Sequence, residues 1–170
     1  MTPEAYRARA LATLGERDPV AVLESLLPAL SRATSGMSAE TLARPETPGK
    51  WSVTQAVRHL ADTELVFGVR IRKMLAEPEP RLPDFDEDLW AAELDYGKSR
   101  LEDSLALLQA TRDANLRLVR GLPPDRLARV GHHPERGAES LGLTLKLIAA
   151  HDLIHLAQIA RIRKSIGVEA

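Results

Sequence analysis

Cysteine is absent from this 170-residue sequence. Its absence excludes disulfide bonds, thiolate metal ligands and a cysteine nucleophile, and it is consistent with a cytoplasmic protein. Any metal ion bound by the chain must therefore be held by nitrogen and oxygen ligands.

Aromatic residues and net charge are also scarce, at 4 % and −1. A surface that binds nucleic acid or an anionic membrane needs excess positive charge, and base stacking needs aromatic side chains. The composition therefore argues against nucleic-acid and membrane partners. No apolar run approaches the roughly 20 residues needed to span a bilayer, and residues 1–19 are too charged for a signal peptide.

Hydrophobic residues make up 44 % of the chain and charged residues 28 %, which is typical of a folded globular protein. The length suits one domain with its own core. We expect a single domain over residues 1–170, in which residues 1–17 form an N-terminal lead segment with a short helix over 3–14.

Apolar residues recur at three- and four-residue spacing in four long segments, which predicts four amphipathic helices. Asp18-Pro19 is a helix start, Ser52 with Gln55 forms a capping box, and Ser99 with Glu102 repeats that pattern. The predicted helices begin near residues 19, 53, 100 and 141, and the second and fourth end near residues 76 and 166.

The segments between these helices are long and irregular. Pro28 should kink or shorten the first long helix, a short helix is expected over 86–93, and residues 131–140 read as a polar loop. Sustained period-two alternation is missing, so no strand pair is predicted. We predict an all-α fold, a four-helix bundle with long crossover connections.

Three histidines stand out within these helices. His151 and His155 lie four residues apart, which places both rings on one helix face, and His59 lies in the second long helix. If the two helices pack together, three imidazoles converge. Three neutral imidazoles with an open fourth position form a typical site for a catalytic divalent ion.

The apolar stripe of the last helix contains His151, His155 and Gln158. Buried polar groups without partners cost about 1–3 kcal/mol each, so these side chains need either a metal ion or hydrogen-bond partners on a facing helix. Both interpretations remain open, and the pair together with His59 favours the metal. The segment lacks the glutamate of an HExxH metalloprotease.

Two carboxylates on the helix of His59 are candidates for catalytic roles. Asp62 follows His59 by about one turn and could line the same pocket. Glu64 falls on the apolar stripe, where it could orient a ligand, act as a base or form a structural ion pair with Arg70 or Arg112. His132 and His133 are adjacent in a loop and read as solvated or loop-bracing.

The sequence resembles the DinB/YfiT-like superfamily of metal-dependent enzymes, in its YfiT-like branch, over roughly residues 18–166. The resemblance is carried by four segments in order: Trp51-Ser52 with Gln55, His59-Leu60-Ala61-Asp62 and Glu64; Pro83-Asp84-Phe85-Asp86-Glu87-Asp88; His133-Pro134-Glu135-Arg136-Gly137; and His151-Asp152 with His155 and Gln158-Ile159.

The resemblance implies a four-helix bundle of unusual connectivity and a divalent transition metal held by His59, His151 and His155. Zinc and nickel are the metals that we expect first, followed by iron, manganese and cobalt. Some relatives join a low-molecular-weight thiol to an electrophile and others resemble hydrolases; homodimers are common, and the family name refers to DNA-damage induction. We therefore expect a transferase or hydrolase acting on a small molecule. The alternative is a non-catalytic, stress-associated bundle with structural metal or none.

Overall fold

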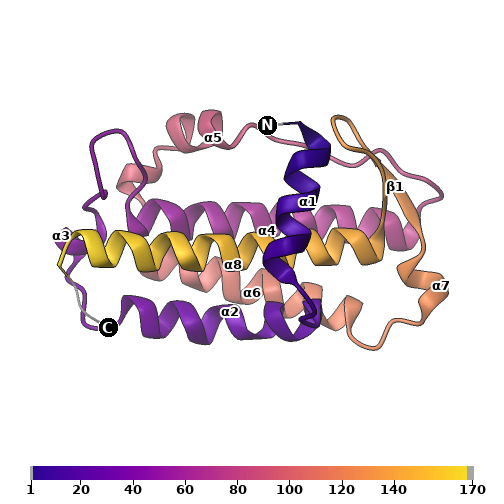
Figure 1. The fold of residues 1–170 in the computed structure, drawn as a ribbon, viewed down its shortest axis with the longest axis horizontal. Coiled ribbons are helices and arrows are strands. Elements are labelled where there is room, and N and C mark those ends of the chain that lie inside the picture. Colours follow the sequence, from indigo (N-terminus) through magenta and orange to yellow (C-terminus); the bar gives the residue numbers. More distant parts are fainter. Residues whose placement is uncertain (1, 168–170) are drawn as a thin grey trace.

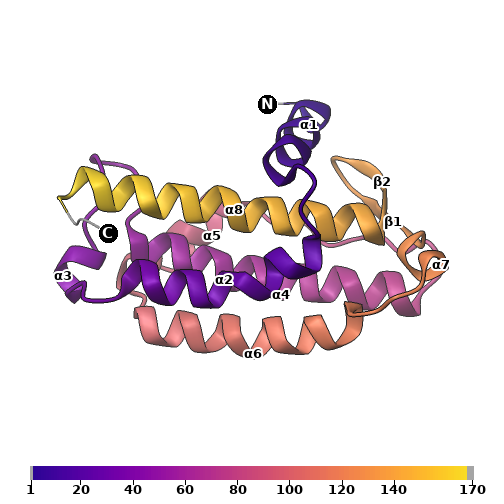
Figure 2. The same ribbon diagram turned by 60° about the horizontal axis from the view of Figure 1, so that its bottom comes forward.

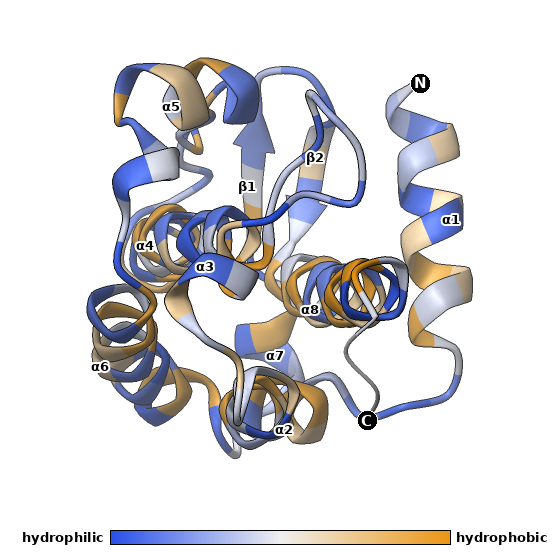
Figure 3. Ribbon diagram, turned by 90° about the vertical axis from the view of Figure 1, so that its left-hand side faces the viewer, coloured by the Kyte–Doolittle hydropathy of each residue, from blue (hydrophilic) through white to orange (hydrophobic). Residues whose placement is uncertain are grey.

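Four long helices lie lengthwise against one another in the computed structural model, which describes residues 2–167 (Figures 1 and 2). They are α2 (Pro19–Thr34), α4 (Val53–Ala76), α6 (Leu101–Val119) and α8 (Leu141–Ser165). Helix α4 packs against α6 and α8, and α2 packs against the same two helices. Viewed end-on, α2 and α4 lie diagonally, as do α6 and α8 (Figure 3). The predicted four-helix bundle with crossover connections is thus confirmed.

The remaining elements lie on the connections. They are α1 (Pro3–Leu14), α3 (Ala39–Leu42), α5 (Glu87–Glu93), the 3-10 helix η1 (Tyr96–Lys98), α7 (Pro124–Leu127), β1 (Val130–His133) and β2 (Gly137–Ser140). Helix α1 packs across α8, while α5 and the hairpin lie above α4 and α8 (Figure 3). Helix α1, helix α5 and the hairpin cover the side of the bundle on which the histidines of α4 and α8 meet, whereas α3 and α7 lie at its two ends (Figure 1).

Capping residues account for most of the helix starts. Ser52 Oγ accepts a hydrogen bond from Gln55 N at 3.3 Å, and Gln55 Oε1 accepts one from Ser52 N at 2.9 Å, which completes the predicted capping box. Asp18 and Ser140 cap α2 and α8 in the same position. The box predicted at Ser99 is wrong, because α6 begins after Arg100 and has no side-chain cap.

One further expectation is wrong in part and another entirely. Of the two effects expected of Pro28, a kink or a shorter helix, the shortening does not occur, because α2 continues to Thr34. A strand pair does exist, since β1 and β2 form an antiparallel hairpin. Its pairing is supported by a segment that is distant in the sequence but in direct contact. Leu82 N donates to His132 O at 2.9 Å, and a Cβ on Gly131 would come within 2.7 Å of the Leu82 side chain. Such contacts leave no local sequence pattern.

Helix α8 is the apolar centre of the molecule. By length and mean hydropathy (1.2) it could cross a membrane, contrary to the expectation that no stretch would approach this limit. In the structure it contacts α1, α2 and α4, and its inner face is fully buried at residues such as Ala149, Ala150 and Ile159. Packing inside the bundle accounts for its hydrophobicity.

Candidate metal centre

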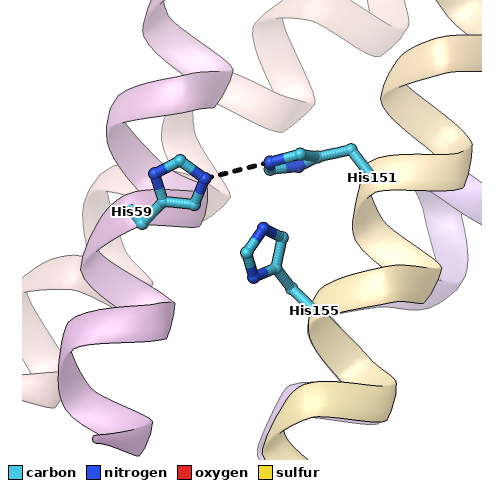
Figure 4. A group of neighbouring side chains, drawn as sticks. All are labelled: His59, His151 and His155. Carbon is cyan, nitrogen blue, oxygen red and sulfur yellow. Dashed lines mark hydrogen bonds between the residues drawn. The ribbon is translucent and has the colours of Figure 1, made fainter. Parts of the chain in front are cut away.

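The structure brings together the three histidines that the spacing singled out. His59 projects from α4, and His151 and His155 project from successive turns of α8 (Figure 4). Nε2 of His59 lies 3.0 Å from Nε2 of His151, and one nitrogen from each ring lies within 4.8 Å of the others. Three imidazoles from two packed helices therefore face a common point.

Burial keeps these imidazoles neutral. Loss of solvent, followed by repulsion from His155, lowers the pKa of His59 to about 3. The same loss of solvent, with repulsion from the two other rings, holds the pKa of His151 well below 6.5. Burial also lowers the pKa of His155, although its bond with Gln158 opposes the shift. Neutral imidazoles carry the free lone pairs that a metal ion requires.

Gln158 determines which nitrogen of His155 is free. Its Oε1 lies 2.7 Å from Nδ1 of His155, and because a carboxamide oxygen only accepts, Nδ1 must carry the proton. The lone pair is thereby left on Nε2, which points toward His59 and His151 (Figure 4). Metal-binding histidines are commonly oriented by a second contact of this kind.

The donor set fits a divalent transition ion. Two nitrogens bound to one ion at about 2.0–2.1 Å lie roughly 3–3.5 Å apart, and the His59–His151 pair is at 3.0 Å. Within residues 2–167 the candidate ligand group holds three histidines and no further carboxylate or histidine. A hydrogen bond between His59 and His151, the alternative interpretation of the sequence, satisfies the same geometry without metal.

Several neighbours of the histidines were not predicted from the sequence. The Trp51 ring centroid lies 4.9 Å from that of His59, and Trp51 stacks on His155 at 6.5 Å. Glu87 Oε2, on α5, lies 3.7 Å from Nε2 of His59. Glu87 was visible only as part of an acidic connection, because the fold of a loop over a helix has no local signal.

The two predicted catalytic carboxylates are engaged elsewhere. Asp62 Oδ2 accepts hydrogen bonds from the Tyr96 hydroxyl at 2.7 Å and from Arg58 Nε at 3.1 Å. Glu64 pairs with Arg112 at 2.9 Å and accepts a bond from Asn115 at 2.7 Å. The structural ion pair considered for Glu64 is thus present, with Arg112 as partner.

Arg112, on α6, connects all four long helices of the bundle, because it also donates to Leu23 O of α2 at 2.8 Å. It also binds Asp152 on α8 through two contacts of 2.7 and 3.2 Å, and both side chains are buried. Burial, opposed by Arg112, raises the pKa of Asp152 to about 6, and the two carboxylates raise the pKa of Arg112. The pair fixes α8 at the residue next to His151.

Two cavities open onto the histidines. The larger, of about 710 Å³, is lined by His59 and His151, and the smaller, of about 450 Å³, by His151 and His155. Tyr6 of α1 lines both. Asp62 and Glu64 line neither of these two cavities. The open side of the centre is therefore reached from two directions, each within the size range of small-molecule sites.

The histidine pair of the hairpin lies apart from this centre. Nδ1 of His133 accepts hydrogen bonds from the backbone of Glu135 at 3.2 Å and of Arg136 at 3.3 Å, so this ring braces the turn. His132 is exposed. The interpretation as solvated and loop-bracing residues matches both positions.

Comparison with known proteins shows the family to which this sequence is similar. The profile described as "DinB superfamily" matches residues 23–159. A protein of Oceanobacillus iheyensis named "Putative metal-dependent hydrolase" is 32 % identical over 142 residues, covering 84 % of this chain and 82 % of that one. A protein of the same name from Bacillus cereus (strain ATCC 10987) is 29 % identical over 145 residues, covering 85 % and 83 %.

A solved structure shares the whole architecture. It is YfiT from Bacillus subtilis, described as "a probable metal-dependent hydrolase with an unusual four-helix bundle topology". The match has a TM-score of 0.82 at 30 % identity and covers 89 % of this chain and 87 % of that one. The unusual topology agrees with the diagonal placement of consecutive long helices.

Proposed function

The chain belongs to the DinB superfamily, and from this membership we propose that it is a metal-dependent hydrolase of small molecules. The observation that carries the proposal is the convergence of His59, His151 and His155 on a point that opens into two cavities. The names of the relatives supply the reaction class.

In this proposal the three histidines hold the ion through nitrogen, a ligand set that suits zinc or nickel and also accepts iron, manganese or cobalt. Such an ion lowers the pKa of a bound water and so supplies a nucleophile near neutral pH. Gln158 fixes the tautomer of His155, and Trp51 shields the rings from solvent.

Glu87 is the carboxylate that we propose for proton transfer. Its Oε2 lies 3.7 Å from Nε2 of His59 and borders both cavities. Its side chain is 63 % exposed, and partial loss of solvent together with the neighbouring acids Asp88 and Asp86 raises its pKa, which favours a group that accepts a proton and returns it. Asp62 and Glu64 act instead through their bonds to Tyr96 and Arg112, as supports of α4.

A thiol S-transferase is the second candidate, and one observation favours it. The two cavities share His151, so two ligands can approach one centre from different sides. The chain has no cysteine, so any sulfur must come from a substrate. A non-catalytic bundle with a structural metal would need a fourth protein ligand, and the candidate group within residues 2–167 has three.

The deciding experiment is elemental analysis of protein purified without a metal-affinity tag. We expect about one equivalent of a transition metal in the wild type and none in the double variant His151→Ala/His155→Ala. His132→Ala, which removes an exposed histidine of the hairpin, should retain the metal. Circular dichroism checks that each variant is folded.

The loaded protein is then assayed with esters, with amides, and with a thiol plus an electrophile. Hydrolysis that is absent from the double variant supports the hydrolase, and conjugation supports the transferase. A wild type that contains no metal and takes none up on titration would rule out both enzymes and leave the hydrogen-bonded helical module.

A further inference from the structure

The inner wall of the larger cavity carries two arginines from different elements, Arg70 on α4 and Arg136 in the turn of the hairpin. Among residues 2–167, Asp84 pairs with Arg70 at 3.3 Å, and Glu139 pairs with Arg136 at 2.6 Å and with Arg7 of α1 at 4.0 Å. Glu139 is thus shared between two arginines, and the partner of the buried Arg70 is an exposed carboxylate.

Arg70 is the most deeply placed of the three. It is 2 % exposed, its guanidinium stacks on Phe67 at 4.7 Å, and it lines the larger cavity. Nε donates to Pro83 O at 2.8 Å and Nη2 to Asp84 Oδ1 at 3.3 Å. Among residues 2–167, Nη1 has no acceptor. A buried guanidinium with unused donors on a cavity wall is equipped to bind an anion.

Arg136 lies on the same wall. Its Nε and Nη2 donate to the buried Glu139 at 2.6 and 3.3 Å, and Arg7 Nη2 donates to Arg136 O at 3.1 Å. Burial, followed by repulsion from Arg136, lowers the pKa of Arg70 to about 10. Two guanidinium groups that repel each other on one cavity wall are stabilised when an anion binds to both.

Tyr6 completes this wall. Burial, with Glu87 and Glu139, raises the pKa of its hydroxyl, whereas Arg136 and Arg70 lower it, and Tyr6 lines the same cavity as both arginines. The hydroxyl has no hydrogen-bond partner within residues 2–167. It is therefore available as a neutral donor toward a ligand in the cavity.

The lining of the cavity also contains acidic side chains, which do not cancel the positive charge of the arginines. These carboxylates are those of Asp86, Glu87, Asp88 and Glu135, all of them exposed. Water and salt screen exposed charges far more than buried ones. A divalent ion at the histidines would add positive charge on the same side as Glu87.

We propose that Arg70 and Arg136, with the Tyr6 hydroxyl, bind the anionic group of the substrate, a carboxylate or a phosphate, in the larger cavity. The substrate is thus an acidic small molecule, anchored at the arginines with its reacting bond at the three histidines. The second half of this statement rests on the proposed function, whereas the anion site does not.

The test is a binding titration of metal-free protein followed by NMR, with succinate, inorganic phosphate and the neutral succinamide as probes. Metal-free protein is used because a bound ion would itself attract anions. We expect one or both anions to bind and succinamide not to bind. Preference for succinate or for phosphate identifies the anionic group. Tyr6→Phe and Arg136→Gln should weaken binding, the latter roughly 10- to 100-fold.

Arg81→Gln is the matched control, because it removes the same charge from an exposed side chain near Asp84. If Arg136→Gln fails to fold, Tyr6→Phe and the salt dependence of anion binding by the wild type carry the test. Equal binding of succinate and succinamide, equal loss in Arg81→Gln, or anion binding only after metal loading would overturn the anion site. Failure to hydrolyse any ester would overturn the proposed function and leave this result intact.

Discussion

At the scale of single residues, the centre depends on a glutamine that would not touch the ion. Gln158 holds the proton of His155 on Nδ1 through a 2.7 Å contact. Without this acceptor the ring can rotate and exchange tautomers, so Gln158→Leu should weaken metal binding by about 10- to 100-fold.

The measurement is competition for the metal against a chelator of known affinity. Gln158→Glu, which keeps an acceptor, should restore most of the affinity. Gln109→Leu removes an exposed glutamine of α6 and is the control. Unchanged affinity in Gln158→Leu would show that the contact does not orient the ligand.

The same histidines make the stability of the metal-free protein depend on pH. Burial holds all three pKa values below the ordinary 6.5, that of His59 at about 3. Below pH 6.5 the unfolded chain therefore binds more protons than the folded one, and stability falls as the pH falls. Asp152, whose pKa is raised to about 6, and Glu87, whose pKa is also raised, oppose this trend, whereas the lowered pKa of His133 adds to it.

A histidine whose pKa in the folded protein lies far below that in the unfolded chain changes the free energy of unfolding by at most about 1.4 kcal/mol per pH unit. We expect the metal-free protein to be about 2–4 kcal/mol less stable at pH 5 than at pH 7, as measured by urea unfolding. The double variant His59→Gln/His151→Gln should show a flatter dependence. Equal stability of the wild type at both pH values would contradict neutral burial of these rings.

At the scale of elements, Gly68 sets the distance between α4 and α6. A Cβ at this position would lie 2.8 Å from both amide atoms of Asn115. Asn115 cannot move without losing its bonds to Glu64 at 2.7 Å and to Arg72 at 2.6 Å. Gly68→Ala should therefore destabilise the protein by about 1–3 kcal/mol, although alanine favours a helix.

Urea unfolding of Gly68→Ala and Gly142→Ala provides the comparison. Gly142 lies in the first turn of α8, where a Cβ would meet Leu127 O at an ordinary 3.5 Å. That variant should be neutral or slightly more stable. A Gly68→Ala protein as stable as the wild type would mean that the two helices can separate at no cost.

Helices and strands could be predicted where the residues that determine them are close together in the sequence. The caps at Asp18 and Ser52 and the i,i+4 pair His151/His155 appear directly in the sequence, and they locate three long helices and one face of the centre. The hairpin was missed because Gly131 packs on Leu82 and the strand bonds to residues 80–82. Pairing with a distant segment leaves no periodic pattern in β1 or β2.

At the scale of the whole molecule, the bundle supplies the three histidines, from α4 and α8, and one part of the cavity wall, Phe67 and Arg70 of α4. The other walls of the larger cavity come from α1, the segment that contains α5, and the hairpin. Spacing within one helix predicts the ligands, whereas the walls arise from contacts across more than a hundred residues, such as Arg7 with Arg136. The charge of the cavity could therefore not be predicted from the sequence.

This division predicts the outcome of removing the lead segment, residues 1–17. Helix α1 buries Ala10 and Leu14 against α8 and places Tyr6 in both cavities, yet it contributes none of the three histidines. A chain of residues 18–170 keeps the Asp18 cap and should fold with one cooperative transition. It should lose about 2–4 kcal/mol of stability through the lost apolar burial and bind the metal with unchanged stoichiometry.

Anion binding should behave differently, because the truncation removes Tyr6 from the wall of the larger cavity and also removes Arg7, which donates a hydrogen bond to Arg136 O. Elemental analysis, urea unfolding and the succinate titration on the same truncated protein separate the two functions. Retained metal with weakened anion binding is the expected result. Loss of the metal would mean that α1 is required to hold α8 against α4, so that the centre belongs to the whole chain rather than to the four long helices.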